Sequence, residues 1–160
     1  MPAAAPSLFD DLDQASRPAE LVVYCDGGSR GNPGPSAIGA LVLDPATDPP
    51  TVLHAISERI GTTTNNVAEY RALIAGLEAA APHRARRIRV RADSKLVIEQ
   101  VAGRWKVRHA HLRPLFDAVR ALLAPYDEVD LAHVPRAANT EADALVNAAL
   151  DGPADGDSSA

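Results

Sequence analysis

The spacing of apolar residues changes several times along the chain, and each change predicts a new element. An unbroken apolar run at Leu21–Cys25 ends at Asp26 and a glycine-rich segment, which is typical of a buried strand. Two further β-like runs, Ala37–Leu43 and Val52–Ile60, are separated by a proline-containing turn over residues 44–50. Short connections between three consecutive strands favour an antiparallel meander.

Helical and β-like patterns alternate in the second half of the chain. Apolar residues keep helical spacing from Val67 to Ala81, in a helix that Asn65 or Asn66 can cap and Pro82 ends. The rest of the pattern predicts a strand at Arg87–Ala92, a short helix that Ser94 caps and Gly103 closes, an amphipathic helix over Leu112–Leu123, a strand at Val129–His133 and a helix over Thr140–Leu150. The order β-β-β-α-β-α-α-β-α implies an α/β fold with helices packed on a mixed sheet.

The two ends of the chain lack such patterns and mark the expected limits of one domain. Residues 1–20 are rich in proline, alanine, serine and acidic residues, which predicts a disordered acidic tail. Residues 151–160 hold no apolar side chain larger than alanine, so we expect a disordered tail or linker remnant. The folded domain is therefore expected at residues 21–150, a length that suits a single domain.

Composition narrows the class of protein. The net charge of −5 comes from the two tails, so an acidic total does not argue against a nucleic-acid partner for the domain. A single cysteine, Cys25, excludes an internal disulfide and points to a reducing compartment. No apolar run reaches the roughly 20 residues of a membrane span, and no basic start with an apolar run marks a signal peptide. We expect a cytoplasmic protein with no membrane partner.

Four acidic residues stand where local structure gives little reason for a carboxylate. Asp26 and Asp93 end predicted strands, while Glu69 and Asp143 lie in the first turns of predicted helices. Each alone also has a local explanation, since aspartate makes turns and acids complement the helix dipole. Together they favour a metal centre, because crowded carboxylates repel one another and persist where a cation holds them. Such oxygen ligands suit Mg²⁺ or Mn²⁺ rather than zinc.

The segment Asp26–Pro35, DGGSRGNPGP, holds four glycines and two prolines directly after a strand. Backbone N–H groups of Gly27, Gly28 and Ser29 can closely approach a phosphate or sugar in such a segment. An ordinary hairpin turn is the alternative interpretation. The length of the segment after the aspartate favours a substrate contact.

Four motifs occur in one order along residues 21–150: YCDGGSRGNPGP, TTNNVAEYRALIAGL, ADSKLV and NTEADALVNAAL. This set resembles the type 1 ribonuclease H family. The resemblance implies a ribonuclease H-like fold, a five-stranded mixed sheet in which three antiparallel strands are followed by two parallel ones. It also implies endonucleolytic hydrolysis of the RNA strand of RNA–DNA hybrids, leaving 5′-phosphate and 3′-hydroxyl ends.

The resemblance assigns a role to each of the four acids. Asp26 would bridge two divalent ions, Mg²⁺ or Mn²⁺, and Asp143 would share the ion that activates water. Glu69 and Asp93 would hold the ion near the leaving oxygen. Two ions acting on an in-line displacement form a recurring hydrolytic arrangement.

Substrate contacts are implied by the same motifs. Asn32, Asn65 and Asn66 match positions that touch the RNA strand or neighbouring bases in the minor groove, where the 2′-hydroxyl distinguishes RNA. Thr64 matches a position that binds a DNA phosphate. For the two adjacent asparagines, capping of the helix is the alternative.

Trp105 and Lys106 lie in the basic run GRWKVRHAHLR, which suits a phosphate track with a packing ring. A tryptophan that only anchors helix packing is the alternative. Many bacterial family members carry a longer basic helix and loop here, so this chain is a short form.

One departure from the family pattern concerns the loop before the last helix. Many members place a histidine there, whereas this chain reads AHVPRAANTEAD. We expect His133 inside the fifth strand, in the core or at the sheet edge, with Arg136 as a partial substitute for the missing histidine. The other histidines, His54, His83, His109 and His111, have no ligand-like spacing with a third partner.

The leading hypothesis is therefore a hybrid-specific ribonuclease that acts as a monomer on RNA–DNA hybrids. The alternatives are a broader nuclease of the same fold that also cuts double-stranded RNA, and a non-catalytic nucleic-acid-binding module. In the N-terminal tail, Leu8 and Phe9 loosely resemble peptides that dock on the bacterial sliding clamp. The alternative for this pair is packing on the domain's own surface, or no role.

Overall fold

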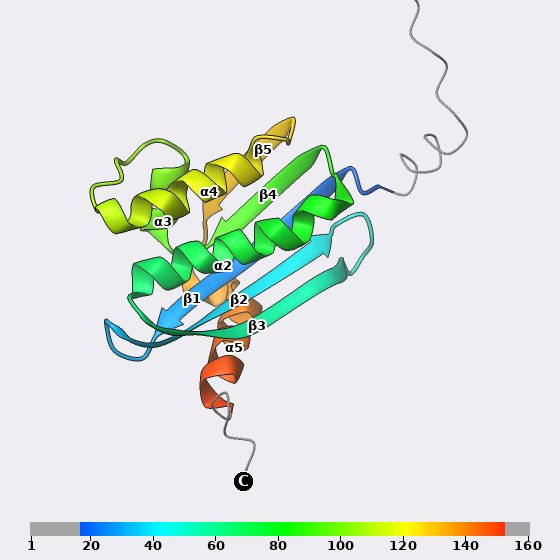
Figure 1. The fold of residues 1–160 in the computed structure, drawn as a ribbon. Helices are drawn as coiled ribbons and strands as arrows, with labels where there is room; N and C mark the ends of the chain where they lie inside the picture. The colour runs from blue at the N-terminus through cyan, green and yellow to red at the C-terminus, as the bar shows by residue number, and fades with distance from the viewer. Residues whose placement is uncertain (1–16, 153–160) are drawn as a thin grey trace, which may run out of the picture.

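A computed structural model describes residues 17–152, and its elements follow the predicted order (Figure 1). The elements are β1 (Glu20–Ser29), β2 (Gly34–Asp44), β3 (Thr51–Thr63), α2 (Asn65–Ala80), β4 (Arg87–Ala92), α3 (Lys95–Val101), α4 (Arg113–Leu123), β5 (Glu128–His133) and α5 (Thr140–Asp151). Three short 3-10 helices join them, η1 (Ala81–His83), η2 (Ala110–Leu112) and η3 (Arg136–Ala138).

The strands form one five-stranded sheet in the order β3-β2-β1-β4-β5. Strand β2 is antiparallel to both β1 and β3, whereas β4 is parallel to β1 and β5 is parallel to β4. The predicted fold class is confirmed, including the split into three antiparallel and two parallel strands. Helices α2, α3 and α4 cover one face of the sheet, and α5 lies against the other (Figure 1).

The core lies between α2 and the middle of the sheet. Tyr70, Leu73 and Leu77 repeat at helical spacing along α2, and all three side chains are fully or almost fully buried. They belong to the same buried cluster as Leu21 and Val23 of β1. Burial of large apolar side chains on this helix fixes its rotation, and therefore the direction in which its polar residues point.

Helix α2 begins one residue earlier than predicted. Thr64 has extended backbone angles, and its hydroxyl accepts a hydrogen bond from the Val67 N–H at 3.4 Å, so it is the capping residue. The prediction that Asn65 or Asn66 caps this helix is therefore wrong. Asn65 is already helical, and its side chain is used elsewhere. The Ser94 cap of α3 is confirmed by a 3.3 Å bond from the Val97 N–H.

Helix α5 is fastened to the meander near its C-terminal end. Arg59 of β3 donates from Nε to the Ala149 carbonyl at 2.7 Å and from Nη2 to the carbonyls of Leu150, at 3.1 Å, and Gly152. Arg30 adds an ion pair with Asp151 at 2.5 Å. The Arg59 guanidinium thus satisfies carbonyl groups that a helix end leaves without partners.

The described elements extend one residue beyond each predicted domain limit, because β1 begins at Glu20 and α5 ends at Asp151. The predictions for the two tails, including the pair Leu8 and Phe9, fall mainly outside the described residues and stay predictions. Within residues 17–152 no helix combines the length and apolar character needed to span a membrane.

Candidate active site

The four acids predicted from the motifs come from four different elements. Asp26 lies inside β1, three residues before its end, and Asp93 directly follows β4. Asp143 is in the first turn of α5. Glu69 lies just past the first turn of α2, which has no acidic residue. The local explanations, a strand-end turn for Asp26 and a dipole partner for Glu69, therefore do not hold.

The structure brings these carboxylates together. One carboxylate oxygen from each of Asp26, Glu69 and Asp93 lies within 4.8 Å of the other two. The Asp26 carboxyl is also within hydrogen-bonding reach of Asp143. All four line a cleft of about 300 Å³, whose other lining residues are Gly27, Gly28, Ser29, Arg30, Asn65, Arg136, Val146, Asn147 and Leu150.

Gly27 allows this approach because it has no side chain. A Cβ atom at this position would lie 2.2 Å from the carbonyl carbon of Ala68, inside the backbone of α2. The absence of that atom lets β1 pass directly beneath the helix, so that the Gly27 N–H donates a hydrogen bond to the Glu69 carboxylate. The glycine after Asp26 is therefore required by packing.

Burial and mutual repulsion disfavour the ionised form of these carboxyl groups unless a cation is bound. The pKa of Asp26 is raised from 3.8 to about 7, mainly by burial and then by the charges of Asp93 and Asp143. Burial, with the charges of Asp26 and Asp93, also raises the pKa of Glu69 well above its usual range. Three converging carboxylates, two of which have a raised pKa, fit a hard divalent cation that would compensate their charge.

Asn139 holds the start of α5 in place, a role that the sequence analysis missed. Its side-chain Nδ2 donates to the Cys25 carbonyl at 2.9 Å, and its own carbonyl accepts from the Asp143 N–H at 3.1 Å. It is almost fully buried. A polar residue just before a helix is the signal that could have suggested it. Cys25 itself is buried, and burial raises its pKa, so the thiol is a packing group.

Three of the predicted substrate residues form one connected unit beside the cleft. Asn65 Oδ1 accepts from the Ser29 N–H at 3.0 Å, and the Asn65 N–H donates to Asn32 Oδ1 at 3.0 Å. The Ser29 hydroxyl also donates to the Thr63 carbonyl at 3.1 Å. These bonds join the β1–β2 loop to the start of α2. Asn66 is exposed next to this unit.

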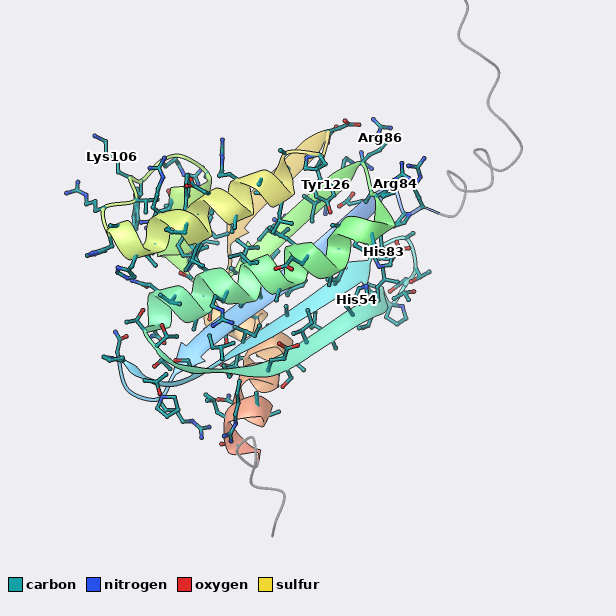
Figure 2. The ribbon with its side chains drawn as sticks, in the orientation of Figure 1. His54, His83, Arg84, Arg86, Lys106 and Tyr126 are labelled. Carbon is teal, nitrogen blue, oxygen red and sulfur yellow. The ribbon has the colours of Figure 1, made fainter. Side chains whose placement is uncertain are left out.

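Trp105 and Lys106 lie apart from the acids, in the segment after α3, and do not line the cleft. Trp105 is 44% exposed, and Lys95 Nζ lies 5.9 Å from the centre of its ring. Lys106 extends into solvent (Figure 2), and its carbonyl accepts from Gln100 at 3.3 Å. This exposed aromatic and basic surface suits contact with a nucleic-acid backbone.

Residues before and within α5 lie beside the acids. His133 is exposed, so of the two predicted locations the sheet edge is correct and the core is not. His133 ends β5 at the sheet edge, and its Nε2–H donates to the Asp93 carbonyl at 3.2 Å. Arg136 lies 3.4 Å from Asp143 with its side chain 80% exposed. Asn147, missed from the sequence, donates to Asp143 at 3.3 Å from the next turn of α5. Its four-residue spacing was the available signal.

Comparison with known proteins places this geometry among nucleases. A family model described as reverse transcriptase-like matches residues 24–149. Ribonuclease HI of Halobacterium salinarum is 45% identical over 92% of this chain and 72% of its own length. The bifunctional protein Rv2228c of Mycobacterium tuberculosis is 49% identical over 84% of this chain, which spans only 36% of that relative's length.

Two solved structures share the arrangement. The N-terminal RNase H domain of Rv2228c superposes with a TM-score of 0.78 at 49% identity, covering 82% of this chain and 99% of that domain chain. LC11-RNase H1, crystallised in complex with an RNA/DNA hybrid, gives a TM-score of 0.74 at 38% identity over 82% of this chain and 96% of that chain.

Proposed function

Since the chain belongs to the type 1 ribonuclease H family, we propose that it hydrolyses the RNA strand of RNA–DNA hybrids to 5′-phosphate and 3′-hydroxyl ends. The observation that carries this proposal is the convergence of Asp26, Glu69 and Asp93 within 4.8 Å, with Asp143 beside them. A relative with 38% identity was crystallised with an RNA/DNA hybrid, which supports the choice of substrate.

The acids would hold two divalent ions, Mg²⁺ or Mn²⁺. When bound, such ions lower the pKa of an attacking water and neutralise the departing oxygen. Asp26 is central to the cluster and would contact both ions. Asp143 would share the ion that activates water, and Glu69 and Asp93 would hold the ion near the leaving oxygen. The Gly27 N–H, bonded to the Glu69 carboxylate, would fix the orientation of that ligand.

The connected unit of Ser29, Asn32 and Asn65 would position the RNA strand. Its three members are tied by backbone-to-side-chain bonds of 3.0 Å, so their free amide and backbone groups present a rigid surface beside the acids. Amide groups can both donate to and accept from a 2′-hydroxyl. Asn66, exposed on the next position of α2, would add a contact to the same strand.

The opposite DNA strand would lie along Thr64 and the surface of Trp105 and Lys106. The Thr64 hydroxyl accepts from the Val67 N–H, which leaves its own proton free for a phosphate oxygen. Trp105 offers a ring face for sugar packing, and Lys106 a positive charge.

Cleavage of four matched duplexes tests the proposal: RNA–DNA, RNA–RNA, DNA–DNA, and DNA with one embedded ribonucleotide. Each is incubated with Mg²⁺, Mn²⁺ or EDTA, and Asp26→Asn serves as the inactive control. We expect metal-dependent cutting of the hybrid RNA only, with a product 5′ end that phosphatase can remove. Comparable cutting of RNA–RNA would support a broader nuclease. Tight binding of the hybrid without any cutting would support a non-catalytic nucleic-acid-binding module.

A further inference from the structure

Two histidines from separate elements meet at the end of the molecule opposite the acid cleft. His54 Nε2 lies 2.8 Å from His83 Nε2, although the residues are 29 positions apart. Both side chains lie near the C-terminal end of α2 (Figure 2), and both are partly buried. Glu69 is 14 residues before His83, which corresponds to about 20 Å along a helix, so the pair is separate from the acid cleft.

Hydrogen bonds hold the backbone that carries each of the two histidines. His54 is inside β3 and pairs with Val42 of β2. His83 ends η1, where Pro82 occupies an early position and Arg84 adopts left-handed angles, with its N–H bonded to the Ala81 carbonyl at 3.1 Å. One ring is therefore carried by a hydrogen-bonded strand and the other by a tight turn. Because the backbone is already ordered at both positions, little backbone conformational entropy is lost when the two rings bind a common ligand.

The distance between the rings fits a common metal ion. Zinc binds imidazole nitrogen at roughly 2.0–2.1 Å with tetrahedral angles, which puts the centres of two ligating rings about 5 Å apart. The centres of His54 and His83 are 5.0 Å apart. Tilting of the two rings about these centres would direct both Nε2 lone pairs at one ion.

We propose that His54 and His83 bind a divalent transition-metal ion, Zn²⁺, through their Nε2 atoms. In the metal-free pair one Nε2 carries a proton and donates it to the other. On binding, that ring carries its proton on Nδ1 instead, so both Nε2 lone pairs face the ion and the neutral pair loses no proton. Among residues 17–152 only Asp26, Glu69 and Asp93 form a cluster of three or more possible ligands, so water completes the zinc coordination.

The two metal sites differ in chemistry. The acid cleft offers carboxylate oxygens, which suit Mg²⁺, whereas the histidine pair offers imidazole nitrogens, which suit Zn²⁺. A bound zinc ion would join β3 to the turn after α2 and would stabilise the folded state, because the pair exists only there. Mg²⁺-dependent hybrid cleavage, which uses the opposite end of the molecule, is expected to be unchanged.

Zinc titration of the full chain, with any purification tag removed and excess Mg²⁺ present, tests this site. Isothermal titration calorimetry and melting temperature are measured for the unaltered chain, His54→Gln and His83→Gln. Two controls accompany them. Asp26→Asn weakens the acid cleft, and the double variant His109→Gln/His111→Gln removes another histidine pair, whose ring centres are 5.6 Å apart.

We expect one zinc ion per chain and a raised melting temperature. Affinity should fall at least about tenfold in either variant of the pair and stay unchanged in both controls. Circular dichroism in EDTA verifies that the variants are folded. Should a variant of the pair unfold, zinc-dependent shifts of the His54 and His83 ring signals in the unaltered chain decide the question by NMR. No zinc binding, binding that survives both substitutions, or ring signals that do not move would overturn the proposal.

Discussion

Replacement of Asp26 by asparagine is expected to abolish hybrid cleavage and yet stabilise the metal-free protein. Asp26 is 6% exposed, and its pKa is raised from 3.8 to about 7. Each pKa unit corresponds to about 1.36 kcal/mol of interaction free energy. At pH 8 the ionised carboxylate therefore lowers the free energy of unfolding by up to about 4 kcal/mol, and asparagine removes that cost.

The sign of the pH dependence follows from the direction of this shift. A carboxyl whose pKa is higher in the folded state binds its proton more tightly there. The unaltered protein in EDTA should consequently lose stability as the pH rises from about 4 to 7. Asp26→Asn should flatten this decline. Mg²⁺ should restore stability to the unaltered chain at pH 8, because the cation compensates the crowded charges, and should restore much less to the variant.

Urea unfolding followed by circular dichroism, at pH 5 and pH 8 in EDTA and then with Mg²⁺, measures both effects. Asp117→Asn is the matched control, since this acid is exposed and, among residues 17–152, its one ion pair is with Arg113 at 3.3 Å. It should change stability by less than about 0.5 kcal/mol. If Asp26→Asn is no more stable than the unaltered chain at pH 8 in EDTA, burial and repulsion within the cluster do not penalise the ionised Asp26 carboxylate, and the reasoning is refuted. Near-normal cleavage by this variant with saturating metal would refute the assignment of Asp26 as a shared ligand.

The remaining predictions concern the surroundings of the cleft and the N-terminal tail. Gly27→Ala should cost several kcal/mol of stability and nearly all cleavage, because its Cβ would lie 2.2 Å from the α2 backbone; a urea unfolding curve that matches the unaltered chain would contradict this. Arg136→Ala should lower the Mg²⁺ concentration for half-maximal cleavage a few-fold, since it removes a positive charge 3.4 Å from Asp143, whereas Arg113→Ala should not change it. His133→Ala should act mainly on melting temperature, as expected for a strand residue, and a large fall in turnover at unchanged melting temperature would show a catalytic role. A peptide of residues 1–18 should bind purified sliding clamp through Leu8 and Phe9, and equal binding by the double-alanine peptide would end that idea.

Local patterns in the sequence were sufficient for the elements and their order, because each element buries a face with its own apolar period. The motifs singled out four acids that the structure brings to one cleft, and their roles stay a prediction. Contacts between distant segments were not predictable in this way. The Thr64 cap depends on where the chain leaves β3, and the burial of Asn139 on a bond to the Cys25 carbonyl, 114 residues away. The histidine pair was passed over because its members are 29 residues apart and only the sheet and η1 bring them together.

The hydrogen bonds from Arg59 to the last carbonyl groups of α5 also determine which contacts bear a pulling force applied at the C-terminal end of the domain. Tension applied to the chain after Gly152 meets the Arg59 bonds and the Arg30–Asp151 ion pair first, and these pass the load to the β-meander. Asp143, two turns earlier on the same helix, lies upstream of that attachment. A bulky partner joined to this end could therefore move or pull without shifting the carboxylate that completes the cleft.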